Sequence, residues 1–155
     1  MKRVSLALLA TTLILAGCSN SGGQLVSLPL TPVPYLMKVD RTIATHLSVE
    51  AATGDWAKQA SKDGALNQAI VYYTPASGSR VIFMSVYEFP AKQFDSLQNP
   101  NQPPPYGQEV IRKNGKVFSI AGPQDSIFDP KTQDGKNISA LYATITKAST
   151  YSTAP

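Results

Sequence analysis

Residues 80–89 (RVIFMSVYEF) constrain the fold most strongly, because this segment is apolar on both sides when it is extended. Alternation along a strand divides it into two rows: Val81, Phe83, Ser85, Tyr87 and Phe89, and then Ile82, Met84, Val86 and Glu88. A strand with two apolar faces needs cover on both of them. We therefore predict a central strand here, inside a sheet that is packed on both faces.

Two hairpins are predicted around this strand. Residues 69–74 (AIVYYT) are rich in β-branched and aromatic side chains, and residues 75–78 (PASG) after them have turn composition. A second hairpin joins residues 108–113 to residues 116–121 through Asn114-Gly115, a pair that suits the positive φ angles of a tight turn. The predicted sheet is therefore antiparallel.

Helices are predicted to flank the sheet. Residues 90–97 suit a short helix with proline in its first turn. Near the C-terminus, apolar residues recur at helical spacing from Asn137, the candidate N-cap, towards Lys147. This stripe consists of Ile138, Leu141, Tyr142 and Ile145. Thr144 and Thr146 leave a strand as the alternative there.

Residues 35–64 carry mixed signals. A short strand near residues 47–49 is favoured, followed by a turn at residues 53–55 and then Trp56. The predicted fold class is α+β: a single small domain in which an antiparallel β-sheet is flanked by helices.

The N-terminal segment is predicted to be an export signal that is removed. Lys2 and Arg3 precede an apolar run over residues 4–16, the pattern of a secretory signal. The run is shorter than the roughly 20 residues that a membrane-spanning helix needs. It ends at Leu15, Ala16, Gly17 and Cys18, and Cys18 is the only cysteine.

The four residues Leu15-Ala16-Gly17-Cys18 closely resemble the lipobox of bacterial lipoproteins. The resemblance implies cleavage before Cys18, attachment of a diacylglycerol to its sulfur, and further acylation of its amino group. Two or more acyl chains anchor a protein stably to a membrane. A plain signal peptide, or a membrane anchor with a chance cysteine, is the alternative.

The resemblance also implies a location in the bacterial cell envelope. In enterobacterial lipoproteins, an aspartate after the lipidated cysteine favours retention in the inner membrane, and Ser19 stands at that position here. We therefore expect a lipid-anchored protein on the outer membrane that faces the periplasm, if the host has an outer membrane.

Length and charge limit what the mature chain can be. Removal of residues 1–17 from 155 leaves 138 residues, enough for one domain with a core that needs no disulfide. Loss of Lys2 and Arg3 lowers the formal charge from +4 to +2, so nucleic acid is not an expected partner.

Domain boundaries follow from composition. Residues 18–34 are rich in glycine, serine and then proline, which predicts a lipidated N-terminus and a flexible tether. Apolar residues between Leu25 and Leu30 leave open that part of it packs on the domain. We predict the globular domain over residues 35–150 and a frayed tail over residues 151–155.

The order of the predicted elements resembles the PsbP/Mog1-like fold, which occurs in several bacterial lipoproteins. The residues that carry this resemblance are Leu47-Ser48-Val49 with Gly54-Asp55-Trp56, then residues 114–118, and the C-terminal stripe. It would cover about residues 45–150. The resemblance implies an antiparallel sheet sandwiched by helices, with docking or assembly roles more than catalysis, although a fold does not determine a function.

Groups for catalysis or metal binding are sparse. His46 is the only histidine and better suits a surface or strand-edge position, while Cys18 is blocked by lipid. No nucleophile and base, and no nitrogen or sulfur set for zinc, are therefore predicted. Asp125, Asp129 and Asp134 would suit calcium, but turn formation is favoured. We predict no enzymatic activity, no metal and no cofactor.

Glu88 stands in an otherwise apolar strand. Burial would raise the pKa of its carboxyl group. An edge or loop-facing position is the simpler interpretation and is the one we favour from the sequence.

Residues 99–107 (NPNQPPPYG) are predicted to form an exposed loop, since proline lacks a backbone donor. Within it, Pro103, Pro104, Pro105 and Tyr106 match by letters a ligand of WW domains, and such segments dock into aromatic grooves. A stiff surface loop is the simpler interpretation. The loop is nevertheless the best candidate for docking another envelope protein.

The predicted function is a non-enzymatic docking or assembly module. A carrier of a small apolar ligand is the first alternative and an envelope hydrolase the second. A pocket of about 300 Å³ or more would favour the carrier. A filled core with an exposed apolar patch would favour the docking module.

Overall fold

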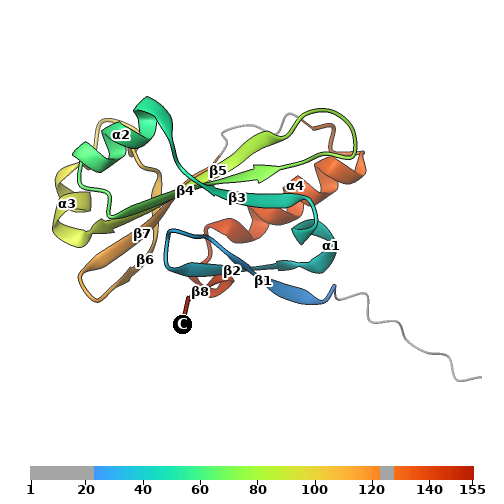
Figure 1. The fold of residues 1–155 in the computed structure, drawn as a ribbon, viewed down its shortest axis with the longest axis horizontal. Helices are drawn as coiled ribbons and strands as arrows, with labels where there is room; N and C mark the ends of the chain where they lie inside the picture. Colours follow the sequence, from blue (N-terminus) through green and yellow to red (C-terminus); the bar gives the residue numbers. More distant parts are fainter. Residues whose placement is uncertain (1–22, 123–127) are drawn as a thin grey trace, which may run out of the picture.

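The fold is described by a computed structural model that covers residues 23–122 and 128–155. These residues form a five-stranded and a three-stranded antiparallel sheet with four α-helices (Figure 1). The predicted α+β class with an antiparallel sheet and helices is confirmed. In chain order the elements are β1 (Leu25–Pro29), β2 (Tyr35–Asp40), α1 (Arg41–Ala44), β3 (Leu47–Ala51), α2 (Gly54–Lys62), β4 (Asn67–Tyr73), β5 (Val81–Pro90), α3 (Ala91–Ser96), β6 (Gln108–Lys113), β7 (Lys116–Ala121), α4 (Gln133–Ile145) and β8 (Tyr151–Thr153).

The five-stranded sheet has the strand order β3-β4-β5-β7-β6, so β5 is its central strand, as predicted. Both predicted hairpins are confirmed, because β4 pairs antiparallel with β5 and β6 pairs antiparallel with β7. Asn114 and Gly115 connect β6 to β7 with φ angles of 51° and 72°. These are the positive values that the Asn-Gly pair tolerates.

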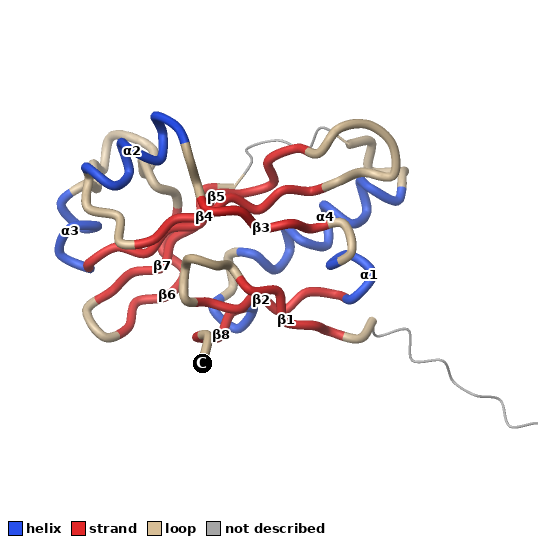
Figure 2. Tube along the Cα trace, viewed as in Figure 1, coloured by secondary structure: helices blue, strands red, loops and turns tan. Residues whose placement is uncertain are grey.

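One face of this sheet, which we call the main face, carries Val71, Val86 and Phe118. The three-stranded sheet (order β1-β2-β8) and α4 cover it and form the larger hydrophobic core. The opposite face, the second face, carries Tyr87 and Phe89 and is covered by α2, α3 and residues near Tyr106. In Figure 2, α2 lies above β4 and β5 of the large sheet, and β1, β2 and β8 lie below β3, β4 and β5.

A β-bulge changes which residues share a face. Val71 pairs with Met84, but the next residue of β4, Tyr72, pairs with Ile82, so Phe83 is an extra residue in β5. A bulge turns two successive side chains towards similar directions. Phe83 and Met84 are consequently both in the larger core, and the prediction that Phe83 shares a face with Tyr87 and Phe89 is wrong.

Both ends of the described chain belong to the domain. Leu30 is 0 % exposed, and β1 before it pairs along its whole length with β2, so the tether that we predicted over residues 18–34 ends before Leu25. At the other end Tyr151 is buried and β8 pairs with β2, so residues 151–153 are not a frayed tail. Partners distant in sequence, rather than local signals, order both segments.

Two helix boundaries also differ from the predictions. Helix α2 begins at Gly54, within the predicted turn, and Trp56 lies in its first turn. Helix α4 begins at Gln133, with Thr132 as its N-cap through a bond from the backbone N–H of Gly135 at 3.1 Å. Asn137, the predicted cap, is buried inside the helix, and the strand alternative for this segment is wrong. The short strand near residues 47–49 is confirmed as β3, and the helix near residues 90–97 as α3.

Candidate functional site

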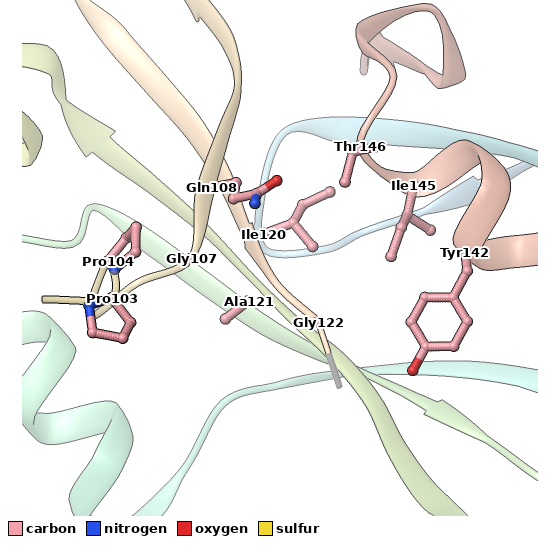
Figure 3. Close-up of a pocket in the computed structure, with 10 residues that line it drawn as sticks. All are labelled: Pro103, Pro104, Gly107, Gln108, Ile120, Ala121, Gly122, Tyr142, Ile145 and Thr146. Carbon is pink, nitrogen blue, oxygen red and sulfur yellow. The ribbon is translucent and has the colours of Figure 1, made fainter. Parts of the chain in front are cut away.

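The candidate site is a groove between the proline-rich loop and the C-terminal end of α4. Its volume is about 320 Å³. We call it the loop–helix groove, and Figure 3 shows the residues that line it: Pro103, Pro104, Gly107, Gln108, Ile120, Ala121, Gly122, Tyr142, Ile145 and Thr146. None of these lining residues is charged, and most of them are apolar.

Gly107 allows the loop to lie directly on β7, which forms the floor of the groove. Its φ is +73°, a conformation that side chains disfavour. A Cβ atom at this position would stand only 2.0 Å from the carbonyl oxygen of Ile120. The close approach of the two backbones therefore requires glycine, and it holds Pro103 and Pro104 beside the groove.

Tyr106 anchors the loop and does not face solvent. It is 3 % exposed, and its ring packs against Phe89 and Tyr87 with centroid distances of 5.0 and 5.1 Å. Its hydroxyl donates a hydrogen bond to the carboxylate of Asp63 after α2. The predicted docking loop is thus exposed at Pro103, Pro104 and Pro105, but the prediction that Tyr106 is exposed is wrong.

The bond between Tyr106 and Asp63 shifts the pKa values of both groups. Burial raises the pKa of Tyr106, and the hydrogen bond to Asp63 raises it further. The donated hydrogen bond from Tyr106, followed by one from Gln59, lowers the pKa of Asp63. The bond therefore joins a neutral phenol to an ionised carboxylate at neutral pH.

Helix α4 supplies the opposite wall of the groove. Ile145 is buried, and Tyr142 packs edge-on against Phe83 with ring centroids 5.8 Å apart. Thr146, the C-cap residue of the helix, is exposed at the rim. The apolar stripe predicts that Tyr142 and Ile145 lie on one side of a helix, but no local pattern indicates that this side meets the proline-rich loop.

Trp56 connects α2 to the same aromatic cluster. It is 56 % exposed, yet its indole N–H donates to the hydroxyl of Tyr87 over 2.6 Å, and its ring lies 6.1 Å from that of Tyr106. Because it is the only tryptophan in the chain, its fluorescence reports on the environment of the loop anchor.

A second depression, with a volume of about 260 Å³, lies near the hairpin between β6 and β7. We call it the Tyr35 pocket, and it is lined by Pro34, Tyr35, Glu88, Lys113, Asn114, Lys116, Thr153 and Ala154. In contrast to the groove, it contains three charged residues.

Glu88 is buried beneath this pocket, at 2 % exposure. Its carboxylate accepts from the side-chain amide of Asn67 at 2.6 Å and from the ammonium of Lys116 at 3.0 Å. The prediction that it faces an edge or a loop is wrong. The sheet register explains its burial, because Asn67 stands directly opposite on β4 and supplies a partner that an isolated carboxylate would lack.

The remaining predicted candidates have structural roles. The Nδ1 atom of His46 lies 2.8 Å from the carbonyl oxygen of Thr74, and its ring stacks on Tyr73 beside the edge strand β3. Asp129 accepts from the backbone N–H of Lys131 at 2.9 Å, as a turn residue does. Asp134 accepts from the Tyr73 hydroxyl at 2.7 Å.

The structure brings no metal-binding cluster together in the part of the chain that it describes. Leu15, Ala16, Gly17 and Cys18 of the lipobox, and Asp125, lie outside the described residues. Among residues 23–122 and 128–155, no helix has both the length and the apolar character to cross a membrane.

Comparison of this chain with protein families, with characterised proteins and with solved structures gave no significant match.

Proposed function

We propose that this protein is a lipid-anchored lipoprotein of the bacterial envelope whose domain is a docking module. Its loop–helix groove binds apolar side chains of another envelope protein. The observation that carries this proposal is an uncharged groove of about 320 Å³ beside the proline-rich loop. A lining without charged side chains offers no ion pair to a charged ligand and favours apolar groups.

The stiffness of the groove walls supports binding. Proline has a restricted backbone, so residues 103–105 lose little conformational freedom when a partner binds. Tyr106 and Gly107 hold this segment against the domain through the bond to Asp63 and the close approach to Ile120. A preorganised wall of this kind suits one or two apolar side chains of a partner.

The short connection to the proposed lipid limits where that partner is. Since β1 begins at Leu25, only six residues, 19–24, separate the domain from Cys18. Even a fully extended chain would keep Leu25 within about 25 Å of Cys18. We therefore infer a partner that lies in or on the same membrane as the anchor.

Photocrosslinking in intact cells tests the groove. A photoreactive amino acid at Thr146, on the groove rim, should give a discrete adduct with one envelope protein. The same amino acid at Ala143, which is exposed on α4 but does not line the groove, should give no such adduct.

Complementation of a deletion strain is a second test. The substitution Thr146→Arg should abolish complementation, because it places a charge at the groove rim. The substitution Ala143→Arg, which adds the same charge to α4 outside the groove, should preserve complementation.

A carrier of a small apolar ligand is the second candidate, because the groove volume of about 320 Å³ just meets the value of about 300 Å³ that would favour a carrier. The docking module is preferred because the groove is open to solvent, whereas a ligand pocket encloses most of its ligand. Native mass spectrometry of the purified protein distinguishes the two. A bound small molecule that Thr146→Arg removes would support the carrier. Equal protein adducts from positions 146 and 143 would contradict the docking proposal.

A further inference from the structure

We propose that the Tyr35 pocket is a second binding site, which takes a small oxyanion with a carboxylate or phosphate group. The pocket is separate from the loop–helix groove, and no residue lines both. The inference therefore does not depend on the proposed docking function or on the lipid anchor.

The first observation is an unpaired hydroxyl in the pocket wall. Tyr35 is 5 % exposed, and its ring is fixed by stacking on Phe118 at a centroid distance of 4.5 Å. Its hydroxyl makes no hydrogen bond to any of the described residues, and it is not one of their fully buried polar atoms, so it is accessible from the pocket that Tyr35 lines. A phenolic hydroxyl that is accessible from a pocket and has no protein partner is available to donate to a ligand.

Two charged residues that line the pocket with Tyr35 influence the pKa of its hydroxyl. Burial raises the pKa of Tyr35, the negative charge of Glu88 raises it further, and the positive charge of Lys116 lowers it. Glu88 and Lys116 both line the pocket. The hydroxyl therefore remains protonated at neutral pH, as a hydrogen-bond donor to an anion must be.

The second observation is a pair of lysines held face to face. Lys113 and Lys116 are directly opposite each other in the register of β6 and β7, on the two sides of the tight turn. Like charges at directly opposed positions of an antiparallel pair are destabilising. A bound anion between the two ammonium groups would remove this repulsion.

The buried carboxylate compensates only one of the two cations. Glu88 accepts from Lys116 at 3.0 Å, whereas Lys113 has no ion pair with any residue that the structure describes. The pocket thus keeps one net positive charge. This net charge favours an anion and disfavours a cation. The hydrogen bond that Lys116 donates to Glu88 also positions the Lys116 ammonium at the pocket wall.

Titration of the purified full chain in a non-ionic detergent tests the site. Sodium acetate and sodium phosphate are added at constant ionic strength and neutral pH, with sodium chloride as the reference, and backbone amide signals are followed by NMR. We expect saturable shifts at Tyr35, Asn114 and Lys116 with acetate or phosphate, and none with chloride. Binding of one anion alone would identify its group as the one recognised.

Two variants remove the proposed contacts without removing the buried ion pair. Tyr35→Phe deletes only the hydroxyl, and Lys113→Met deletes the uncompensated charge. Each variant should raise the Kd for the bound oxyanion at least fivefold. The matched controls are Tyr72→Phe and Lys92→Met, which alter residues outside the pocket and should leave the Kd unchanged.

Two outcomes would overturn the proposal. One is the absence of saturable shifts with both oxyanions. The other is binding that all four variants leave equally strong, which would mean that general surface charge attracts the anion. Circular dichroism of each variant confirms that it is folded before the comparison is made.

Discussion

The two faces of the five-stranded sheet are covered by different parts of the chain. The main face is covered by the two ends of the domain, namely β1 and β2 from the start and α4 and β8 from the end. The second face is covered by segments that are inserted between neighbouring strands: α2 between β3 and β4, and α3 with the proline-rich loop between β5 and β6.

The chemistry of the two covers differs as well. Aliphatic side chains such as Leu30, Val71 and Ile138 dominate the main face. The second face is mainly aromatic, and its phenol and indole groups are tied by hydrogen bonds, from Trp56 to Tyr87 and from Tyr106 to Asp63. The loop–helix groove lies where these two covers meet, because one wall belongs to the loop and the other to α4. A site at this border has one wall from each cover and is open between them.

The largest expected effect on stability tests whether the N-terminal segment is part of the core that covers the main face. Leu30→Ala should destabilise the protein by about 2–5 kcal/mol, because it leaves a cavity in the core. Leu25→Ala, in the same segment but at a residue that is 64 % exposed, should change stability by less than about 0.5 kcal/mol. Urea unfolding measures both. Equally small losses would mean that the segment is a tether after all.

The second-largest effect on stability is expected at Gly107, where the proline-rich loop lies against β7. Gly107→Ala should cost about 2–4 kcal/mol, since it adds a backbone clash to an unfavourable φ. Gly115→Ala is the matched control. Its φ is also positive, at +72°, but a Cβ there meets nothing within 4 Å, so about 1 kcal/mol is expected. Similar losses for the two variants, measured by urea unfolding, would show that the close approach to β7 is not needed.

A polar network at the end of the main face gives a smaller effect. The hydroxyl of Tyr73 donates to Asp134 at 2.7 Å and accepts from the side-chain amide of Asn137 at 3.0 Å. Tyr73→Phe leaves the buried Asn137 donor unpaired and should cost about 1–3 kcal/mol. Tyr72→Phe, one residue earlier, removes a hydroxyl with no hydrogen bond to the described residues and should cost less than about 0.5 kcal/mol. Thermal unfolding measures the loss of stability in both variants. Equal losses for Tyr73→Phe and Tyr72→Phe would contradict a stabilising role for the network.

The smallest effect is a pH dependence on the second face. The pKa of Asp63 is lower in the folded protein than its ordinary value of 3.8, mainly because Tyr106 donates to it. This stabilisation is complete above the unfolded pKa and is lost as the pH falls through the folded pKa. Tyr106→Phe should therefore be less stable than the original protein at pH 7, and the difference should shrink below about pH 4. Urea midpoints between pH 7 and pH 2 measure it. A difference that does not vary with pH would contradict the role of this bond.

The hairpins were predictable because their signals are local. Asn114-Gly115 suits only a few turn geometries, and the apolar segment at residues 80–89 is too long and too apolar for any but a central strand. The stripe through Ile138 and Ile145 likewise predicted a helix from spacing alone. Each of these elements depends on residues within one or two turns of each other, which a sequence pattern contains.

The candidate sites were predictable only in part. The proline-rich loop was found from its composition, but the burial of Tyr106 depends on Asp63, which lies 43 positions away. Lys113 and Lys116 could have been recognised as opposed charges from the two-residue turn between them. Tyr35 could not, because β2 reaches the pocket only through its contact with Phe118.

The sequence by itself determined the antiparallel hairpins and the class of the fold, since turn chemistry and periodicity are local properties. The lipobox at Leu15 to Cys18 is likewise a prediction from a short local motif. Only the tertiary structure decided that Leu30 and Tyr151 are core residues, that Glu88 is buried with Asn67 and Lys116, and that the loop meets α4. These outcomes depend on contacts between residues far apart in the chain, whose gain in burial outweighs the entropy of bringing them together. A local pattern contains no measure of that balance.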